Sequence, residues 1–157
     1  MSRSNAPPRR VVHYDSLAEI VADAENISAA PHETVGSWSY GQILWHISTA
    51  MNASFDGFGF QAPWFVRKLI APFFRWRFLH KPMSAGFKLP QRAAKVLGPS
   101  ADISVEEGMK MLRDAVSRFE TETPSAPHPV FGPMTPDECL LLHMRHSELH
   151  MSFVKPS

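Results

Sequence analysis

The chain contains a single cysteine, Cys139, and lacks any long hydrophobic run. One cysteine excludes an internal disulfide bond, and it also excludes a zinc site built from cysteines alone. No stretch approaches the roughly 18 uncharged apolar residues of a membrane-spanning helix. At 157 residues, with 44% hydrophobic and 20% charged residues, the sequence predicts one globular domain with a substantial core.

Acidic residues are missing from the middle of the chain. None occurs between Asp56 and Asp102, although the formal net charge of the whole chain is only +1. The basic residues of this interval are Arg67, Lys68, Arg75, Arg77, Lys81, Lys88, Arg92 and Lys95. Because the total charge is near neutral and no nucleic-acid motif is recognisable, we do not expect nucleic-acid binding.

The N-terminus is basic and contains two adjacent prolines, Pro7 and Pro8, with no apolar signal core after them. We expect residues 1–15 to form a flexible arm and residues 16–157 to form the folded domain of a cytoplasmic protein.

Four segments have the apolar periodicity of amphipathic helices, and three of them have marked starts. Ser39 with Gln42, and Thr135 with Glu138, match the capping-box pattern, while Ser104 is a suitable N-cap. We therefore expect helices over about 16–29, 39–56, 104–122 and 135–153. The sequence contains no convincing pair of strands.

A long connection, rich in proline and aromatic residues, separates the second and third expected helices. We expect one or two short helices over 64–79, broken near Pro72, and an extended, turn-rich chain over 81–100. Four helices with one long crossover predict an all-α four-helix bundle. The crossover is long enough for the second and third helices to run parallel.

The last expected helix carries three histidines on one face. His143, His146 and His150 are three and then four residues apart, so they fall within roughly a 60° arc. Apolar residues flank that arc, which therefore is not a solvated face. Buried imidazoles need hydrogen-bond partners or a metal ion.

The pattern favours a divalent-metal site made by His46 of the second helix with His146 and His150 of the fourth. Two histidines at positions i and i+4 can bind one ion, and three imidazoles leave coordination positions open for water or substrate. We expect zinc or nickel. The alternative is a set of hydrogen-bonded structural histidines, and three on one arc argue against it.

Two further residues on the same helix have candidate roles. His143 is our candidate catalytic residue, because an imidazole titrates near pH ~6.5 and can transfer protons, although it can also replace another ligand. Cys139 can be an alternate thiolate ligand. Asp56 and Glu148 are interpreted as solvated acids. The sequence has neither the His-Glu-x-x-His zinc motif nor a Glu-x-x-His pair of the di-iron type.

Three segments resemble the DinB/YfiT-like superfamily, and more narrowly an uncharacterised branch with a W-S-x-G-Q-I-L-x-H signature. They are 36–46 (GSWSYGQILWH), 128–138 (HPVFGPMTPDE) and 142–150 (LHMRHSELH). The resemblance implies an up-down-down-up four-helix bundle, a divalent metal on His46, His146 and His150, and a homodimer. Characterised relatives include transferases and isomerases that use a low-molecular-weight thiol such as bacillithiol, mycothiol or glutathione.

Two classes of function stay open. One is a metal-dependent thiol transferase or hydrolase acting on a small molecule, with Arg67, Lys68, Arg75 and Arg77 suited to carboxylates on the substrate. The other is a non-catalytic metal-binding or membrane-surface module using the basic aromatic segment 62–81. We favour a crossover packed on the bundle over a membrane surface.

Overall fold

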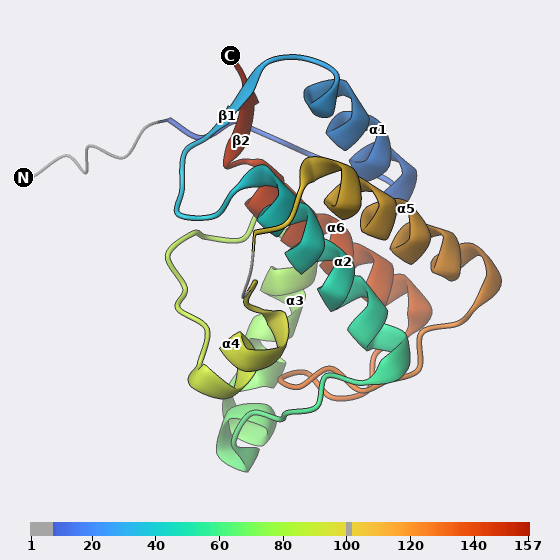
Figure 1. The fold of residues 1–157 in the computed structure, drawn as a ribbon. Coiled ribbons are helices and arrows are strands. Elements are labelled where there is room, and N and C mark those ends of the chain that lie inside the picture. The colour runs from blue at the N-terminus through green and yellow to red at the C-terminus, as the bar shows by residue number, and fades with distance from the viewer. Residues whose placement is uncertain (1–7, 100–101) are drawn as a thin grey trace, which may run out of the picture.

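The computed structural model describes residues 8–99 and 102–157, and it is mainly helical (Figure 1). Four helices pack against one another in the centre, at the positions that the apolar periodicity predicted. They are α1 (Leu17–Ser28), α2 (Tyr40–Asp56), α5 (Val105–Thr121) and α6 (Pro136–Met151). Their inward side chains form one core, in which Ile20, Leu44, Ile47, Leu112 and Met151 are fully buried.

The starts of these helices are fixed by side-chain caps. The hydroxyl oxygens of Ser39 and Thr135 each accept a hydrogen bond from the backbone N–H three residues later. The side chains of Gln42 and Glu138 complete both capping boxes by accepting from the cap residue's own N–H. The predicted capping boxes are therefore confirmed, and they set where the histidine-bearing helices begin.

Helices α2 and α5 run parallel. At their starts a Cβ on Gly41 would lie 1.9 Å from the carbonyl oxygen of Ile103, so only glycine allows this close approach. At their ends the rings of Phe55 and Phe119 lie 4.7 Å apart between centroids. Because the two starts meet and the two ends meet, the long connection must return along the bundle.

The connection between α2 and α5 is more helical than the sequence indicated. A π-helix, η1 (Val66–Ile70), leads directly into α3 (Ala71–His80), with Pro72 in the first turn of α3. The predicted helical structure over 64–79 is thus confirmed, whereas the predicted break near Pro72 is wrong, because the helical backbone continues through it. The expectation of an extended chain over 81–100 is wrong, because α4 (Gln91–Leu97) lies within it. This seven-residue helix has weak sequence periodicity, and it buries only Ala93 and Leu97.

A short antiparallel strand pair lies beside the helices, contrary to the expectation of none. Strands β1 (His32–Thr34) and β2 (Val154–Pro156) pair with Glu33 opposite Lys155, and these two side chains form a 2.8 Å ion pair. Three residues per strand are too few to show the alternation by which strands are predicted.

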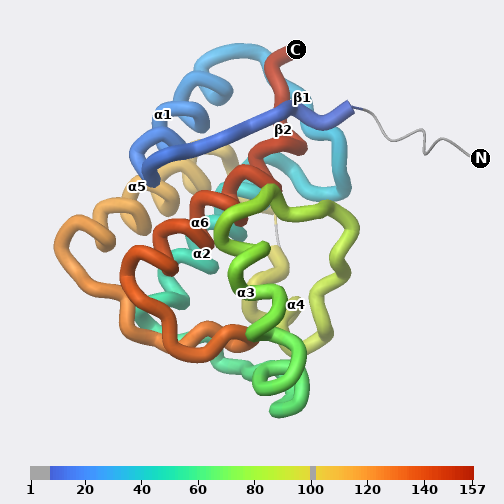
Figure 2. Tube along the Cα trace, turned by 180° about the vertical axis from the view of Figure 1, so that it is seen from behind, coloured from blue at the N-terminus to red at the C-terminus, as the bar shows by residue number. Residues whose placement is uncertain are grey.

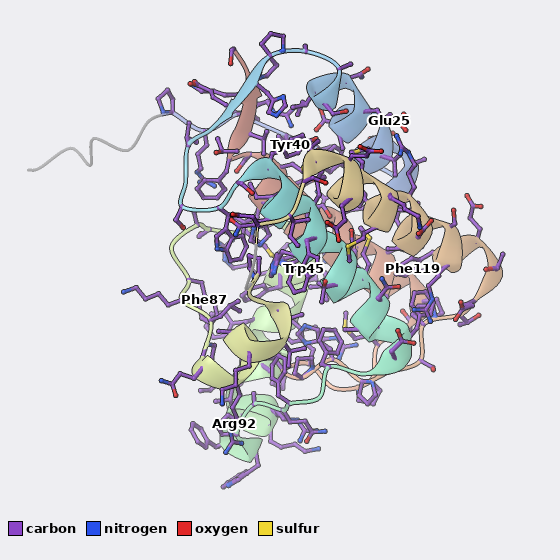
Figure 3. All side chains as sticks on the ribbon, viewed as in Figure 1. Glu25, Tyr40, Trp45, Phe87, Arg92 and Phe119 are labelled. Carbon is purple, nitrogen blue, oxygen red and sulfur yellow. The ribbon has the colours of Figure 1, made fainter. Side chains whose placement is uncertain are left out.

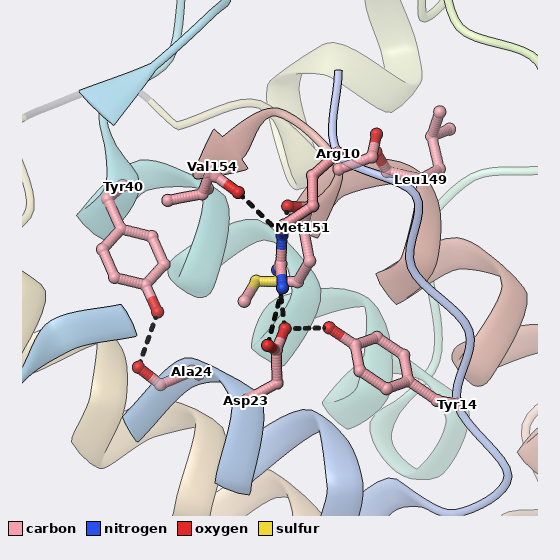
Figure 4. Close-up of polar contacts among 9 residues, drawn as sticks. Arg10, Tyr14, Asp23, Ala24, Tyr40, Leu149, Met151 and Val154 are labelled. Carbon is pink, nitrogen blue, oxygen red and sulfur yellow. Dashed lines mark hydrogen bonds and ion pairs between the residues drawn. The ribbon is translucent and has the colours of Figure 1, made fainter. Parts of the chain in front are cut away.

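Residues 8–15 lie against the bundle (Figure 2). The Arg10 guanidinium donates to both carboxylate oxygens of Asp23 at 2.7 Å and to the carbonyl of Val154 at 3.0 Å (Figure 4). The Tyr14 hydroxyl donates to the same Asp23, and burial together with that carboxylate raises the pKa of the phenol. The flexible arm was expected over 1–15, and its first seven residues lie outside the described ranges.

Candidate metal centre

Three histidines that are distant in sequence meet between α2 and α6. One nitrogen from each of His46, His146 and His150 lies within 4.8 Å of the nitrogens of the other two. The Nε2 atoms of His46 and His146 are only 3.1 Å apart. These are the three residues that the sequence pattern and the resemblance singled out, and the cluster can hold a metal ion.

The packing of the two helices creates this convergence. His146 and His150 are one turn apart on α6, with ring centroids 4.6 Å apart. The His46 ring from α2 meets both, at 4.9 Å from His146 and 4.4 Å from His150. His46 is buried, whereas the other two retain partial exposure.

The proton of His46 is fixed by the backbone of α4. Its Nδ1 lies 2.6 Å from the carbonyl oxygen of Leu97, and a carbonyl only accepts, so Nδ1 carries the proton. The lone pair of Nε2 consequently points toward His146 and His150. Metal-binding histidines commonly make such a hydrogen bond through their other nitrogen. Sequence reasoning missed Leu97, because it acts through its backbone.

Burial keeps all three imidazoles neutral at neutral pH. It lowers the pKa of His150 to about 3, with His46 adding to the effect. Burial also lowers the pKa of His146 well below the ordinary value, helped by the neighbouring His150 and His46. The pKa of His46 is lowered by burial and partly restored by the Leu97 carbonyl. Neutral imidazole is the form that binds metal.

One separation between the cluster nitrogens matches that of two ligands on a tetrahedral ion. Two nitrogen ligands at zinc's usual ~2.0–2.1 Å lie about 3.3 Å from each other. The 3.1 Å between His46 and His146 is close to this value, and the other separations are no more than 4.8 Å, so the rings must draw together for all three nitrogens to share one ion. The donor set, three neutral imidazoles, therefore fits a divalent ion such as zinc or nickel.

Trp38 borders the cluster just before α2. Its indole is stacked on His150, with centroids 5.6 Å apart and planes 12° from parallel, and it is tilted against His46 at 4.9 Å. These contacts hold the ring planes of two cluster histidines. In the sequence, Trp38 is marked as the first residue of the W-S-x-G-Q-I-L-x-H signature.

His143 and Cys139 lie outside the three-histidine cluster. His143 is buried, and its Nε2 is 2.7 Å from the Ser54 hydroxyl oxygen of α2. Burial lowers the pKa of this imidazole to about 3. Cys139 is also buried next to Ser54, and burial raises the pKa of its thiol. A proton-transfer role for His143 stays a prediction.

Glu148 is not a solvated acid, contrary to the sequence interpretation. It is buried, it accepts a 2.8 Å hydrogen bond from the backbone N–H of Tyr14, and it lies 3.1 Å from the Arg145 guanidinium. The chain before α1 covers Glu148, and the sequence around Glu148 does not indicate this burial. Asp56, by contrast, pairs with Arg118 at the surface.

Surface hollows occur elsewhere on the described residues, and neither of the following two is lined by a cluster histidine. One, of about 500 Å³, is lined by the starts of α2 and α5, including Tyr40 and Ser104. The other, of about 320 Å³, lies along residues 57–61. Neither hollow therefore identifies a substrate space beside the cluster.

A family model described as "Protein of unknown function (DUF1569)" matches residues 7–157. The chain belongs to the DUF1569 family. This family is DinB/YfiT-like, in agreement with the resemblance read from the sequence segments. The narrower branch with the W-S-x-G-Q-I-L-x-H signature stays a prediction. Neither the comparison with curated proteins nor the one with solved structures found a match.

Among the described helices of this DUF1569 protein, none combines the length and the apolar character needed to cross a bilayer.

Proposed function

We propose that this DUF1569 chain is a DinB-like protein that binds a divalent metal and uses it for thiol transfer or hydrolysis on a small molecule. The up-down-down-up bundle and the homodimer that the resemblance implies belong to this proposal. The observation that carries it is the convergence of His46, His146 and His150, with the His46 proton held on Nδ1 by Leu97.

The histidines would hold the ion, and the substrate would approach beside the two partly exposed ones, His146 and His150. When bound, the ion supplies Lewis-acid chemistry, which lowers the pKa of a thiol or water ligand. His46 cannot turn away, because its ring is buried and tied to Leu97, while Trp38 holds the plane of His150. Three imidazoles leave positions free for the reacting groups.

His143 is the proposed proton-transfer residue. It lies three residues before His146 on α6, so the two are separated by about one helical turn. Its Nε2 lies 2.7 Å from the Ser54 hydroxyl oxygen, so one hydrogen bond joins the two groups. A neutral imidazole is available for proton transfer at neutral pH.

The basic residues of the connection contribute less to substrate binding than the sequence indicated. The Arg75 guanidinium donates to both carboxylate oxygens of Glu138, at 3.0 and 2.6 Å, and it is therefore committed to structure. Arg67 donates to the nearby Gln61 side chain. We therefore assign neither of these arginines to a substrate carboxylate.

The test is a turnover screen of the metal-loaded protein. Low-molecular-weight thiols would be incubated with electrophiles, and simple esters with water, while free thiol and acid are measured. Activity in the wild type that is lost in His146→Ala and kept in His80→Ala supports the proposal. A lower rate with unchanged metal content in His143→Gln supports its proton-transfer role. Full metal loading without any turnover would overturn the proposed thiol transfer or hydrolysis. The protein would then be a non-catalytic metal-binding protein.

A further inference from the structure

Residues 64–81, which contain η1 and α3, present large apolar side chains to solvent. Phe73 is 83% exposed, Trp64 69%, Trp76 61% and Leu69 60%. Phe65, Ile70, Phe74 and Phe78 are also exposed. Single exposed apolar residues are ordinary, but a group of this size on one segment marks an interaction surface. We call these eight residues, with Lys68, Arg77 and Lys81, the aromatic–basic surface.

Part of this surface forms one outward stripe along η1 and α3. Leu69, Phe73, Trp76 and His80 are spaced four, three and four residues apart, so they form one stripe along the segment. On the opposite side Ala71 and Leu79 are buried. Helix α3 packs beside α6 (Figure 2), so the stripe cannot turn inward without breaking that contact.

Arg75 locks this orientation. Besides its paired bonds to Glu138, its guanidinium donates to the backbone carbonyls of Phe131 at 3.1 Å and Pro133 at 3.0 Å. A side chain with four such bonds holds α3 against the start of α6. The exposure of the aromatic–basic surface is therefore built into the fold.

The charge of this surface has one sign. Lys68, Arg77 and Lys81 are exposed beside the aromatic rings, and no acidic residue occurs between Asp56 and Asp102. The ammonium of Lys81 lies 5.5 Å from the centroid of the Trp76 ring. The chain that follows α3 also combines aromatic and basic side chains. Among them, Phe87 and Arg92 lie at the periphery of the molecule (Figure 3).

We propose that the aromatic–basic surface binds an anionic lipid surface, with its rings in the headgroup boundary and its cations on lipid phosphates and carboxylates. Tryptophan and phenylalanine beside lysine and arginine are the side chains that settle at this depth. Each basic residue near an anionic leaflet strengthens binding about fivefold. This function is independent of the metal centre, because none of the surface residues belongs to the histidine cluster.

A second copy of the chain fits this surface less well. A two-fold dimer places the same patch on both sides of the interface. Lys68, Arg77 and Lys81 would then meet the partner's equivalent cations, without acidic residues from this segment to pair with them. An anionic lipid surface complements both the charge and the apolar rings.

The experiment is vesicle co-sedimentation of the full chain. Vesicles of phosphatidylcholine alone would be compared with vesicles that also contain phosphatidylserine, at low and at high salt. The proposal expects pelleting with the anionic vesicles, weakened by salt. Phe73→Ser with Trp76→Ser should abolish pelleting, and Lys68→Gln with Arg77→Gln should weaken it about 25-fold, fivefold for each charge.

Two variants elsewhere serve as matched controls. Val11→Ser removes an apolar side chain that is 98% exposed on the N-terminal segment, and Lys110→Gln removes a cation from α5. Both should pellet like the wild type. If the wild type stays in the supernatant with anionic vesicles at low salt, the proposal is overturned. It is also overturned if sedimentation velocity shows a dimer that the Phe73 and Trp76 substitutions dissociate while vesicles remain unbound.

Discussion

The Nε2 atoms of His46 and His146 lie 3.1 Å apart, although 100 positions separate the two residues in the chain. With both rings neutral, this contact requires either a proton on His146 Nε2 or a cation between the two nitrogens. The Leu97 carbonyl removes the option of a proton on His46 Nε2. The Nε2 atom of His46 therefore offers its lone pair to His146 or to a cation, and His150 lies beside the pair.

Divalent metal should raise the thermal stability of the wild-type chain. A ligand at about 100 times its dissociation constant stabilises the folded state by about 2.7 kcal/mol, which corresponds to roughly 5–10 °C for a protein of this size. Differential scanning fluorimetry with zinc or nickel measures the shift. His150→Ala should lose it, while His80→Ala, on the exposed side of α3, should keep it. An equal shift in both variants would place the ion elsewhere.

Gly41→Ala should destabilise the fold by about 2 kcal/mol or more, although alanine normally favours a helix over glycine by about 1 kcal/mol. The added Cβ would lie 1.9 Å from the Ile103 carbonyl oxygen, and backbone cannot move aside as a side chain can. Urea unfolding measures the change, with Thr49→Ala on the same helix as the control. Unchanged stability in Gly41→Ala would mean that α2 and α5 are further apart than described.

Arg75→Ala should lower the free energy of unfolding by about 2 kcal/mol, because it removes charge-assisted hydrogen bonds to Glu138 and to two carbonyls. Arg75→Lys should recover only part of this, since lysine lacks the planar fork. Arg67→Ala, which loses only the bond to Gln61 at the surface, should fall within about 0.5 kcal/mol of wild type. Equal losses in Arg67→Ala and Arg75→Ala would contradict the anchoring of α3.

Acid should destabilise the chain through His128. Burial lowers the pKa of this imidazole to about 4, with Arg75 adding to the effect, and its Nδ1 accepts from the backbone N–H groups of Val130 and Phe131. The unfolded chain, with a pKa near 6.5, binds the proton first. The contribution of His128 to stability is therefore complete above about pH 6.5 and falls, by at most about 3 kcal/mol, as the pH drops to about 4.

His128→Asn keeps an acceptor for the loop but does not titrate. Its urea midpoint should therefore fall less than that of the wild type between pH 7 and pH 4. Parallel curves for the two proteins would show that His128 does not control this part of the acid response.

The four central helices were predictable because each buries an apolar stripe that repeats at helical spacing, and because two starts carry complete capping boxes. The grouping of His46 with His146 and His150 was predictable from the i, i+4 pair and the resemblance. Each of these signals lies within one short segment of the sequence, or combines two such segments.

The remaining features depend on contacts between distant segments. Helix α4 is too short to show periodicity, yet its Leu97 carbonyl fixes the proton of His46. Glu148 reads as an ordinary surface acid of a helix, and it becomes buried only because the chain around Tyr14 folds over it. The stripe on α3 has the apolar composition of a buried helix. Its exposure depends on the bonds of Arg75 to Glu138 and to the chain before α6, which the sequence of α3 alone does not indicate.

The most direct measurement of the central claim is the metal content of untagged protein by mass spectrometry, for wild type and for His46→Ala. The account predicts close to one divalent ion per wild-type chain and its loss in His46→Ala, with His80→Ala unchanged. No metal in the wild type, even after soaking with zinc, nickel and manganese, would contradict it and make the three histidines a structural hydrogen-bonded cluster.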